Sequence, residues 1–252
     1  MKKCLTILAI VIFSIFGLQA KAQVSQPYEE EPKVNLEDFG WVNFGLGLQL
    51  SYPMGDYKKA YDKTSVGIGG NIGYQFRDVP LQVGFDGAYM IYGSNTERRP
   101  WSSTIPNVYL DVTTNYSFSF GHLYARVQPS QGVIKPYVEG LFGFNYLATT
   151  TEVDNSHYDE DENIASTTNF DDFVMSYGLG GGAQIALISF PMDFTTRKGQ
   201  LLLDLGVKYI FGGEAEYLPD NGLRVENGQV YYSPRKSKTD IVTARIGVEL
   251  KF

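Results

Sequence analysis

Apolar and polar residues alternate along most of the chain with a period of two. From Trp41 to Tyr52, every second residue is large and apolar, whereas the residues between are mostly small or polar. Successive side chains of a β-strand point to opposite faces, so this segment predicts a strand with one apolar and one polar face. The pattern recurs in segments at about 66–76, 81–92, 108–128, 136–148, 173–188, 201–211 and 239–252. It therefore predicts an all-β chain of about eight strands.

The segment at about 108–128 departs from the simple pattern. Its apolar residues occupy even positions up to Phe120 but odd positions from Leu123 onward. An extra residue in one strand of a pair would shift the faces by one position. We therefore expect a β-bulge near Gly121 or His122.

The links between these segments alternate in length. Those near 77–80, 129–135 and 189–199 are short to moderate, whereas those at 53–64, 93–107, 149–172 and 212–238 are long and polar. Bacterial outer-membrane barrels have an even number of strands, short periplasmic turns and long extracellular loops. Each segment also reaches the roughly 9–11 residues that cross a bilayer at a tilt. The chain is therefore predicted to be a single closed antiparallel transmembrane β-barrel in the outer membrane of a Gram-negative cell.

The beginning of the chain has the pattern of a secretory signal peptide. Two lysines precede an apolar run from Leu5 to Leu18, and small residues follow at Ala20 and Ala22. Cys4, the only cysteine, precedes this run and would be removed with it, leaving no disulfide or lipid anchor. We expect a signal peptide at 1–22, a poorly ordered acidic periplasmic lead-in at 23–39, and the barrel at 40–252.

The net charge of the chain limits the classes of molecule that it is expected to bind. The whole chain carries a formal net charge of −7, with 21 basic and 28 acidic residues. Residues 1–22 contain three lysines and no acid, so cleavage would make the mature chain still more negative. A strongly acidic chain argues against binding of nucleic acid.

Charged residues also fall on the polar face of the predicted strands. An eight-stranded barrel has an interior just wide enough for side chains to fill, and buried charges persist when they are paired. We therefore predict a salt-bridge network that closes the lumen, with a narrow channel for small solutes as the alternative. The predicted members are Asp86, Arg126, Glu139, Asp204, Lys208, Arg245 and Glu249.

The acidic link at 149–172 is a weak candidate for a metal site. Asp159 and Asp161, beside His157, could offer oxygen ligands to Ca²⁺. The spacing lacks the glycine and terminal glutamate of an EF-hand loop, so a solvated loop is the favoured interpretation. We expect neither a metal nor another cofactor.

Catalytic residues are scarce. The chain has two histidines, His122 and His157, and the sequence places no carboxylate behind either one. An enzyme is therefore the least favoured class. Aromatic residues near strand ends are interpreted as girdles at the membrane interfaces, among them Trp41, Tyr52, Tyr92, Trp101, Tyr109, Tyr209 and Tyr217.

Two stretches and the last residue carry a family resemblance. They are Arg126-Val127-Gln128-Pro129, Lys135-Pro136-Tyr137-Val138-Glu139-Gly140 and the terminal Phe252. With these features the chain resembles the outer-membrane β-barrel domain proteins of Bacteroidetes, a group akin to OmpA-like and OmpX-like small barrels. The resemblance spans essentially the whole mature chain and implies its fold and location.

The same resemblance implies partners. A last strand ending in Phe252 resembles the signal read by the barrel-assembly machinery during insertion. We also expect contacts with outer-membrane lipid and lipopolysaccharide, whose phosphates could meet Arg98, Arg99, Arg235, Lys236 and Lys238, although solvated loops are favoured there. The leading function is a structural or surface-interaction barrel whose surface ligand the sequence does not identify.

Overall fold

The computed structural model describes residues 39–102, 105–155, 163–192, 197–219, 223–226 and 229–252. The predicted signal peptide and nearly all of the predicted acidic lead-in lie outside the described residues. Asp159 and Asp161 of the acidic link lie outside them as well. No helix in the described part of the chain is long and apolar enough to cross a membrane.

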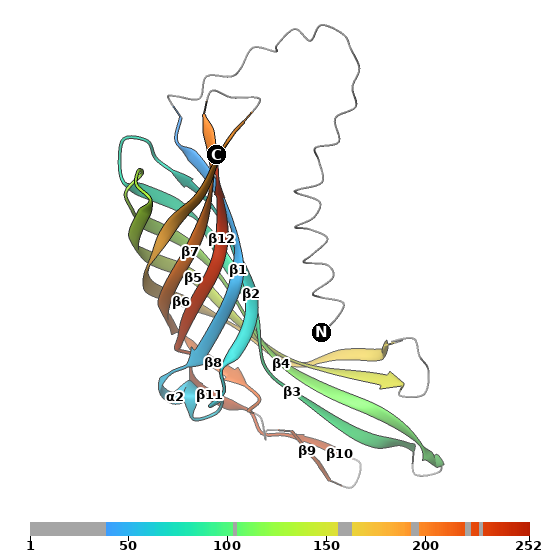
Figure 1. Cartoon of the computed structure of the whole chain (residues 1–252). Coiled ribbons are helices and arrows are strands. Elements are labelled where there is room, and N and C mark those ends of the chain that lie inside the picture. The colour runs from blue at the N-terminus through green and yellow to red at the C-terminus, as the bar shows by residue number, and fades with distance from the viewer. Residues whose placement is uncertain (1–38, 103–104, 156–162, 193–196, 220–222, 227–228) are drawn as a thin grey trace, which may run out of the picture. The chain divides into compact units, whose positions relative to one another are not determined.

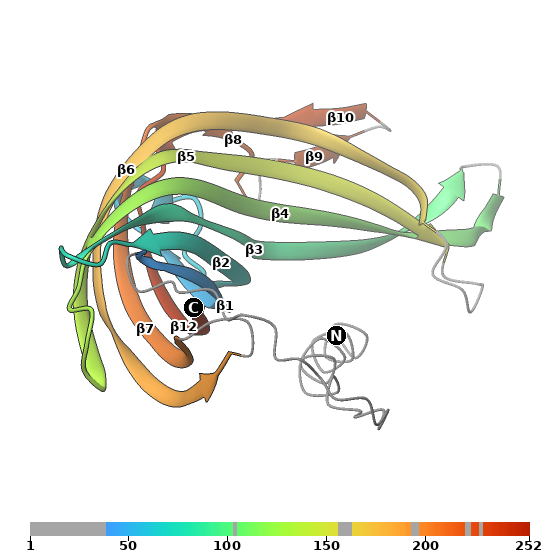
Figure 2. The ribbon, with the colours of Figure 1, turned by 90° about the horizontal axis from the view of Figure 1, so that it is seen from above.

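Eight of the described strands close into an antiparallel barrel, which confirms the predicted fold class (Figures 1 and 2). Neighbours in the sequence pair with each other, and the last barrel strand pairs back to the first along eleven residue pairs, from Asn43 opposite Lys251 to Pro53 opposite Ile241. The barrel strands, in spatial order, are β1 (Trp41–Pro53), β2 (Ser65–Gln75), β3 (Leu81–Ser102), β4 (Ile105–Val127), β5 (Ile134–Asn155), β6 (Asn163–Pro191), β7 (Lys198–Gly212) and β12 (Ile241–Lys251).

The alternation in the sequence becomes the outer and inner walls of this barrel. Apolar side chains point outward, as at Leu179, which is 68% exposed, and at Ile246 on β12. Polar side chains at the alternate positions of the same strands point inward, as at Gln184 on β6 and Arg245 on β12, which are buried. This inside-out distribution is the reverse of a water-soluble domain, in which large apolar residues gather inside.

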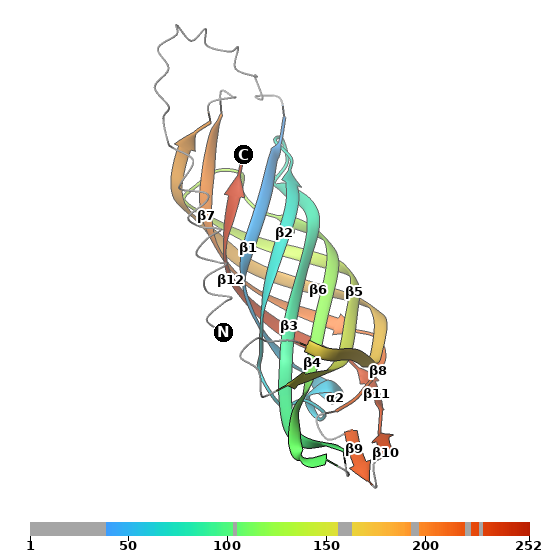
Figure 3. The ribbon, with the colours of Figure 1, turned by 90° about the vertical axis from the view of Figure 1, so that its right-hand side faces the viewer.

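The two ends of the barrel differ. One end, the turn end, holds the links 76–80 and 128–133 together with the end of β6, the start of β7, the start of β1 and the end of β12. The other end, the loop end, holds α2 (Gly55–Lys58) and two small hairpins within the link 213–240 (Figure 3). The hairpins pair β8 (Glu214–Tyr217) with β11 (Arg235–Lys238), and β9 (Leu223–Glu226) with β10 (Gln229–Tyr232).

Two of the predicted long links are largely strand. β3 and β4 stay paired out to Ser102 and Ile105, and β5 and β6 continue to Asn155 and Asn163 (Figure 2). The prediction ended these strands where apolar alternation stopped. Threonines keep strand propensity there without an apolar face, and they meet across strands, as Thr96 does with Thr113 through hydroxyls 3.0 Å apart.

The predicted bulge near Gly121 or His122 is wrong. The pairing of β4 with β3 runs without a shift from Ser117 to Val127, and the shifts lie elsewhere, between Ile91 and Gly93 and between Pro100 and Ser102. Even positions of β4 therefore face inward from Thr114 to Arg126. The apolar residues change face because the interior itself changes from polar at the middle of the barrel to aromatic toward the loop end, where Phe118 is fully buried.

Candidate functional site in the barrel interior

All seven charged residues predicted for the lumen lie inside the barrel, each no more than 4% exposed. They come from five strands and meet in one continuous chain of ion pairs. We call this series of ion pairs the charge chain. Its members, in order, are Glu249, Arg126, Glu139, Lys208, Asp86, Arg245 and Asp204. Acid and base alternate at every step, so each base lies between two acids.

The first half of the charge chain centres on Arg126. Its Nε donates to Glu139 Oε2 at 2.8 Å, and one terminal nitrogen lies 3.7 Å from Glu249 Oε2. The guanidinium carbon lies 3.9 Å from the ring centroid of Tyr137, a cation–π contact. Charge pairing and ring stacking together fix the planar side chain, which lysine could not reproduce.

The second half crosses the barrel. Lys208 on β7 donates to Asp86 Oδ2 on β3 at 2.7 Å, and its Nζ lies 3.5 Å from Glu139 Oε1. Arg245 on β12 lies 3.1 Å from Asp86 Oδ1 and 3.1 Å from Asp204 Oδ2. The contact of Arg245 with Asp204 joins the neighbouring strands β12 and β7. The other three contacts join strands that are not neighbours in the sheet, so they brace the barrel across its interior.

Neutral side chains satisfy further oxygens of the charge chain. Asn43 donates to Glu249 at 2.8 Å, Asn71 donates to the other oxygen of Glu249 at 3.2 Å, and the Tyr137 hydroxyl donates to Asp204 at 3.0 Å. Arg245 also donates to the Asn71 side-chain oxygen. Buried charges are tolerated when such hydrogen bonds accompany the ion pairs.

Glycines on the inner wall of β6 make room for this arrangement. A Cβ atom at Gly180 would come within 3.1 Å of both Lys208 and Glu139, whose ion pair passes over β6. A Cβ at Gly182 would lie 2.7 Å from the Tyr137 ring. The absence of side chains at these two positions lets large residues of β5 and β7 meet across the strand between them.

His122 is also buried, but its contacts do not form a nucleophilic pair. Its Nε2 lies 2.8 Å from Ser176 Oγ, and the Ser176 hydroxyl donates to Asn145 Oδ1 at 3.0 Å. Because that hydroxyl proton points to the amide, His122 is the donor toward serine. A serine nucleophile needs the opposite direction of proton transfer.

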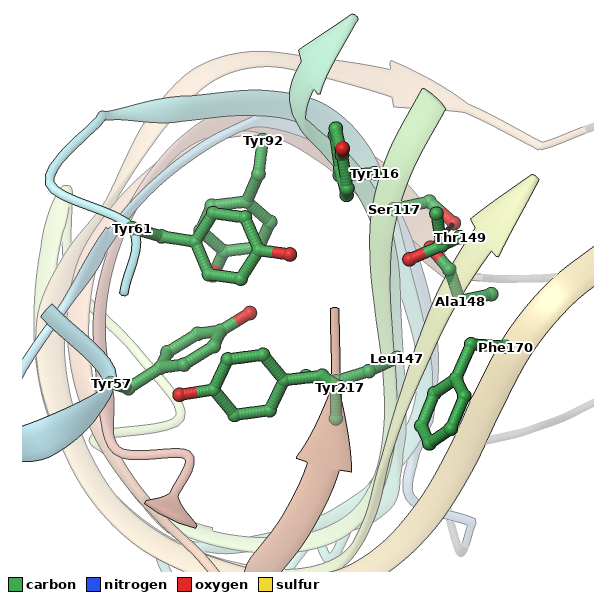
Figure 4. Close-up of a pocket in the computed structure, with 10 residues that line it drawn as sticks. All are labelled: Tyr57, Tyr61, Tyr92, Tyr116, Ser117, Leu147, Ala148, Thr149, Phe170 and Tyr217. Carbon is green, nitrogen blue, oxygen red and sulfur yellow. Dashed lines mark hydrogen bonds between the residues drawn. The ribbon is translucent and has the colours of Figure 1, made fainter. Parts of the chain in front are cut away.

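An aromatic plug fills the interior at the loop end. Five buried tyrosines form it, and we call them the tyrosine cluster: Tyr57, Tyr61, Tyr92, Tyr116 and Tyr217. Figure 4 shows the Tyr57 and Tyr217 rings directed toward each other, with centroids 5.1 Å apart and nearly perpendicular planes. The cavity among these rings holds about 10 Å³, about the least that a single water molecule requires.

Two links carry the tyrosine cluster into the barrel. Tyr57 belongs to α2, and the nearby Tyr61 donates its hydroxyl hydrogen to the backbone carbonyl of Leu218. Burial raises the pKa of the Tyr57 hydroxyl well above its ordinary value, and burial also raises the pKa of Tyr217. Both hydroxyls therefore stay neutral at physiological pH, which suits a packed interior.

In contrast to the tyrosine cluster at the loop end, the interior at the turn end holds basic side chains. Lys135 and Lys251 are buried there, and each donates to a glutamine. Neither lysine was predicted to lie in the interior, although both occupy inward positions of the alternating pattern, between Ile134 and Pro136 and between Leu250 and Phe252. The same rule would have found Asn43, Asn71 and Tyr137.

Three aromatic residues that were assigned to the interface girdles face inward. Tyr92 and Tyr217 are buried in the tyrosine cluster, and the Trp41 ring lies beneath the cations of Arg197 and Lys251. The prediction relied on proximity to a strand end and ignored the parity of the position. Side chains of Trp101 and Tyr109 lie outside the described residues.

The weak candidate for a metal site in the acidic link receives no support from the described part of that link. Asp171 accepts a hydrogen bond from Tyr146, and Asp172 accepts one from the backbone of Glu216 on β8. Among the described residues, no three histidine, cysteine or carboxylate side chains group as metal ligands would. Asp159 and Asp161 themselves are not described.

Two predicted contacts with other molecules stay predictions. Phe252 is 38% exposed at the end of the barrel, and its backbone exchanges two hydrogen bonds with Val42. Recognition of Phe252 by the assembly machinery stays a prediction. Arg235 and Lys236 are exposed on β11, where lipopolysaccharide phosphates could reach them.

Several solved structures are similar to this chain. Ail of Yersinia pestis, solved with the heparin analogue sucrose octasulfate, is 13% identical, with 85% of this chain and 99% of that chain covered at a TM-score of 0.39. OprG of Pseudomonas aeruginosa is 14% identical, with 85% and 97% covered at 0.39. Neisserial surface protein A is 11% identical, with 84% and 95% covered at 0.38. The search of curated proteins found no relative.

A closed antiparallel barrel with an apolar outer wall and a charged inner wall is an outer-membrane β-barrel. The model of the family described as outer membrane protein beta-barrel domain matches residues 8–190 of this chain. The chain belongs to that family, and the protein is located in the outer membrane.

Proposed function

We propose that this protein is a closed, non-enzymatic barrel that holds long strand hairpins rigidly at the cell surface, where they contact other molecules. The observation that carries the proposal is the unbroken chain of seven charges across the interior. Such ion pairs make the barrel rigid, because contacts between opposite walls resist changes in its cross-section.

The same interior argues against the alternative of a narrow channel. Conduction needs water-filled space along the lumen, whereas the charge chain and the tyrosine cluster occupy two successive layers of it. The cationic groups of the charge chain already have carboxylate partners. An ion passing through would have to displace them at a large electrostatic cost.

The arrangement around His122 argues against an enzyme. Its Nδ1 has no hydrogen-bond partner among the described residues, so no carboxylate orients the ring. Ser176 beside it is 1% exposed. A substrate would therefore have no access to the Ser176 hydroxyl. His122 also does not act as a general base toward this serine, because it donates to the hydroxyl.

Electrical recording tests the closed lumen. Purified mature protein in a planar bilayer is expected to give no sustained conductance, because the interior is filled by paired charges and aromatic rings. Incorporation is checked separately by recovering the protein from liposomes and comparing its gel mobility before and after boiling. Sustained conductance, with ion selectivity altered by Lys208→Gln, would instead make the lumen a channel and end this proposal.

Surface labelling tests the orientation that the function requires. Long loops of outer-membrane barrels face outward and short turns face the periplasm, so the loop end should be outside the cell. An epitope tag inserted at Asn221 is expected to bind antibody on intact cells, whereas a tag at Asp78 in the link 76–80 should bind only after permeabilisation. The reverse pattern would place the hairpins in the periplasm, where they could not serve surface contacts.

A further inference from the structure

Two lysines at the turn end are buried, and neither forms an ion pair with any described residue. Lys251 is 2% exposed and Lys135 is 1% exposed. Lys251 Nζ donates to Gln75 Oε1 at 2.7 Å and to the Ser130 carbonyl at 3.4 Å, and Lys135 Nζ donates to Gln200 Oε1 at 2.9 Å. Among the described residues, neither ammonium group has a carboxylate within ion-pair distance.

This situation contrasts with the middle of the barrel. There, every cation of the charge chain lies between two carboxylates, and all four buried acids are already engaged. Removing an ammonium group from water is costly unless a negative charge accompanies it. Two such groups, close enough to interact with each other, would be stabilised by an anion that no described residue places within ion-pair distance of them.

A cavity of about 300 Å³ adjoins Lys251. Its wall includes Lys251, Arg197 and Lys198, and also Gln200, which accepts the hydrogen bond from Lys135. The Trp41 ring forms one side, with the Lys251 ammonium 4.5 Å and the Arg197 guanidinium 4.8 Å from its centroid. The volume is at the lower limit of pockets that bind small ligands, about 300 Å³.

We propose that this cavity is a binding site for a phosphate-bearing anion. Three cationic side chains line one small space, which favours an anion carrying more than one charge or several acceptor oxygens. A guanidinium beside an ammonium suits the oxygens of a phosphate group. The phosphate could belong to a free solute or to a lipid headgroup, since the cavity opens at the end of the barrel. The site does not depend on whether the lumen conducts.

Trp41 provides a direct reporter of occupancy. The chain has two tryptophans, so Trp101→Phe leaves Trp41 as the only indole. The mature protein with this change is refolded in maltoside micelles, which contain no phosphate, and is titrated with inorganic phosphate at constant ionic strength. We expect a saturable change in fluorescence, and Lys251→Met should weaken the apparent affinity at least tenfold.

A matched variant separates the site from general charge effects. Lys236→Met removes an exposed lysine at the opposite end of the barrel and should leave the titration unchanged. Lys251→Arg keeps the charge and should retain most of the affinity. Gel mobility before and after boiling verifies folding, and if Lys251→Met does not refold, Lys135→Met applies the same test with a severalfold expected loss.

A second titration distinguishes the source of the phosphate. Short-chain phosphatidylglycerol is added to the micelles in place of inorganic phosphate, with an uncharged short-chain monoacylglycerol as the control. A Lys251-dependent response to inorganic phosphate supports a free solute, and one to phosphatidylglycerol alone supports a lipid headgroup. The proposal is overturned if neither titration saturates. It is also overturned if adding Lys251→Met or Lys135→Met leaves the response the same as in the protein that carries only Trp101→Phe.

Discussion

Replacing Arg126 by methionine is expected to lower the free energy of unfolding by about 3–5 kcal/mol. The change removes the base that pairs with Glu139 at 2.8 Å and approaches Glu249 at 3.7 Å. Both carboxylates are almost fully buried, so they would keep their negative charge in a poorly solvated site or take up a proton. Methionine fills a similar volume, which limits the effect of a cavity. Urea unfolding in detergent, followed by the loss of β-sheet circular dichroism, measures the change.

Two control variants isolate the effect of buried charge. Lys236→Met removes one partner of an ion pair with Glu214 in which both side chains are more than 60% exposed, and it should cost only about 0–1 kcal/mol. The double variant Arg126→Met with Glu249→Gln removes the carboxylate that Arg126→Met leaves without a base, because Glu139 still pairs with Lys208, and it should recover part of the loss. Equal costs for Arg126→Met and Lys236→Met would contradict a buried network.

Replacing Phe118 by alanine is expected to cost a similar amount, about 3–5 kcal/mol, for a different reason. Phe118 is fully buried beneath the tyrosine cluster, 5.8 Å from the Tyr92 ring and 6.5 Å from the Phe120 ring. Truncation leaves a cavity that rigid barrel walls cannot collapse to fill. The same unfolding measurement applies.

Phe142 provides the matched control. It lies on β5 beside β4, but it points outward and is 59% exposed, so detergent or lipid replaces the lost ring without leaving a void. Phe142→Ala should therefore cost much less than Phe118→Ala. If the outward residue proves the more costly of the two, the inward direction assigned to even positions of β4 is wrong.

The barrel itself could be predicted because its side chains obey a local rule. A period of two assigns each residue to one wall, and this placed Asp86, Lys208 and Arg245 in the interior before any pairing was known. Parity does not reveal which charges meet. Lys208 and Asp86 are 122 residues apart, and their contact depends on closure of the barrel.

The aromatic plug could not be predicted by the same rule. Alternation separates the two faces of a strand, but the wall that each face joins is then inferred from its polarity. Around Phe118 the inward face is apolar and the other face carries Ser117 and Ser119, so polarity alone assigns these faces to the wrong walls. Tyr57 and Tyr217 reach the interior from links, whose conformation has no periodic signal in the sequence. Their contact joins residues 160 positions apart through packing alone. Lys135 and Lys251, in contrast, obeyed parity and could have been assigned from it.

The charge chain also bears on the order of folding. β12 is the last barrel strand in the sequence, yet it supplies two of the seven charges, Arg245 and Glu249. Until this strand pairs with both β7 and β1, Asp204 has no ion-pair partner among the described residues, and the carboxylate of Asp86 lacks one of its two bases. Without β12, the network holds three acids and two bases, and Asp204 lacks a base. β12 adds one base and one acid, so it does not change the net charge, but Arg245 supplies the missing partner of Asp204 and the second base of Asp86 as the sheet closes. Closure of the barrel and completion of the buried ion pairs therefore occur together, which disfavours partly assembled barrels.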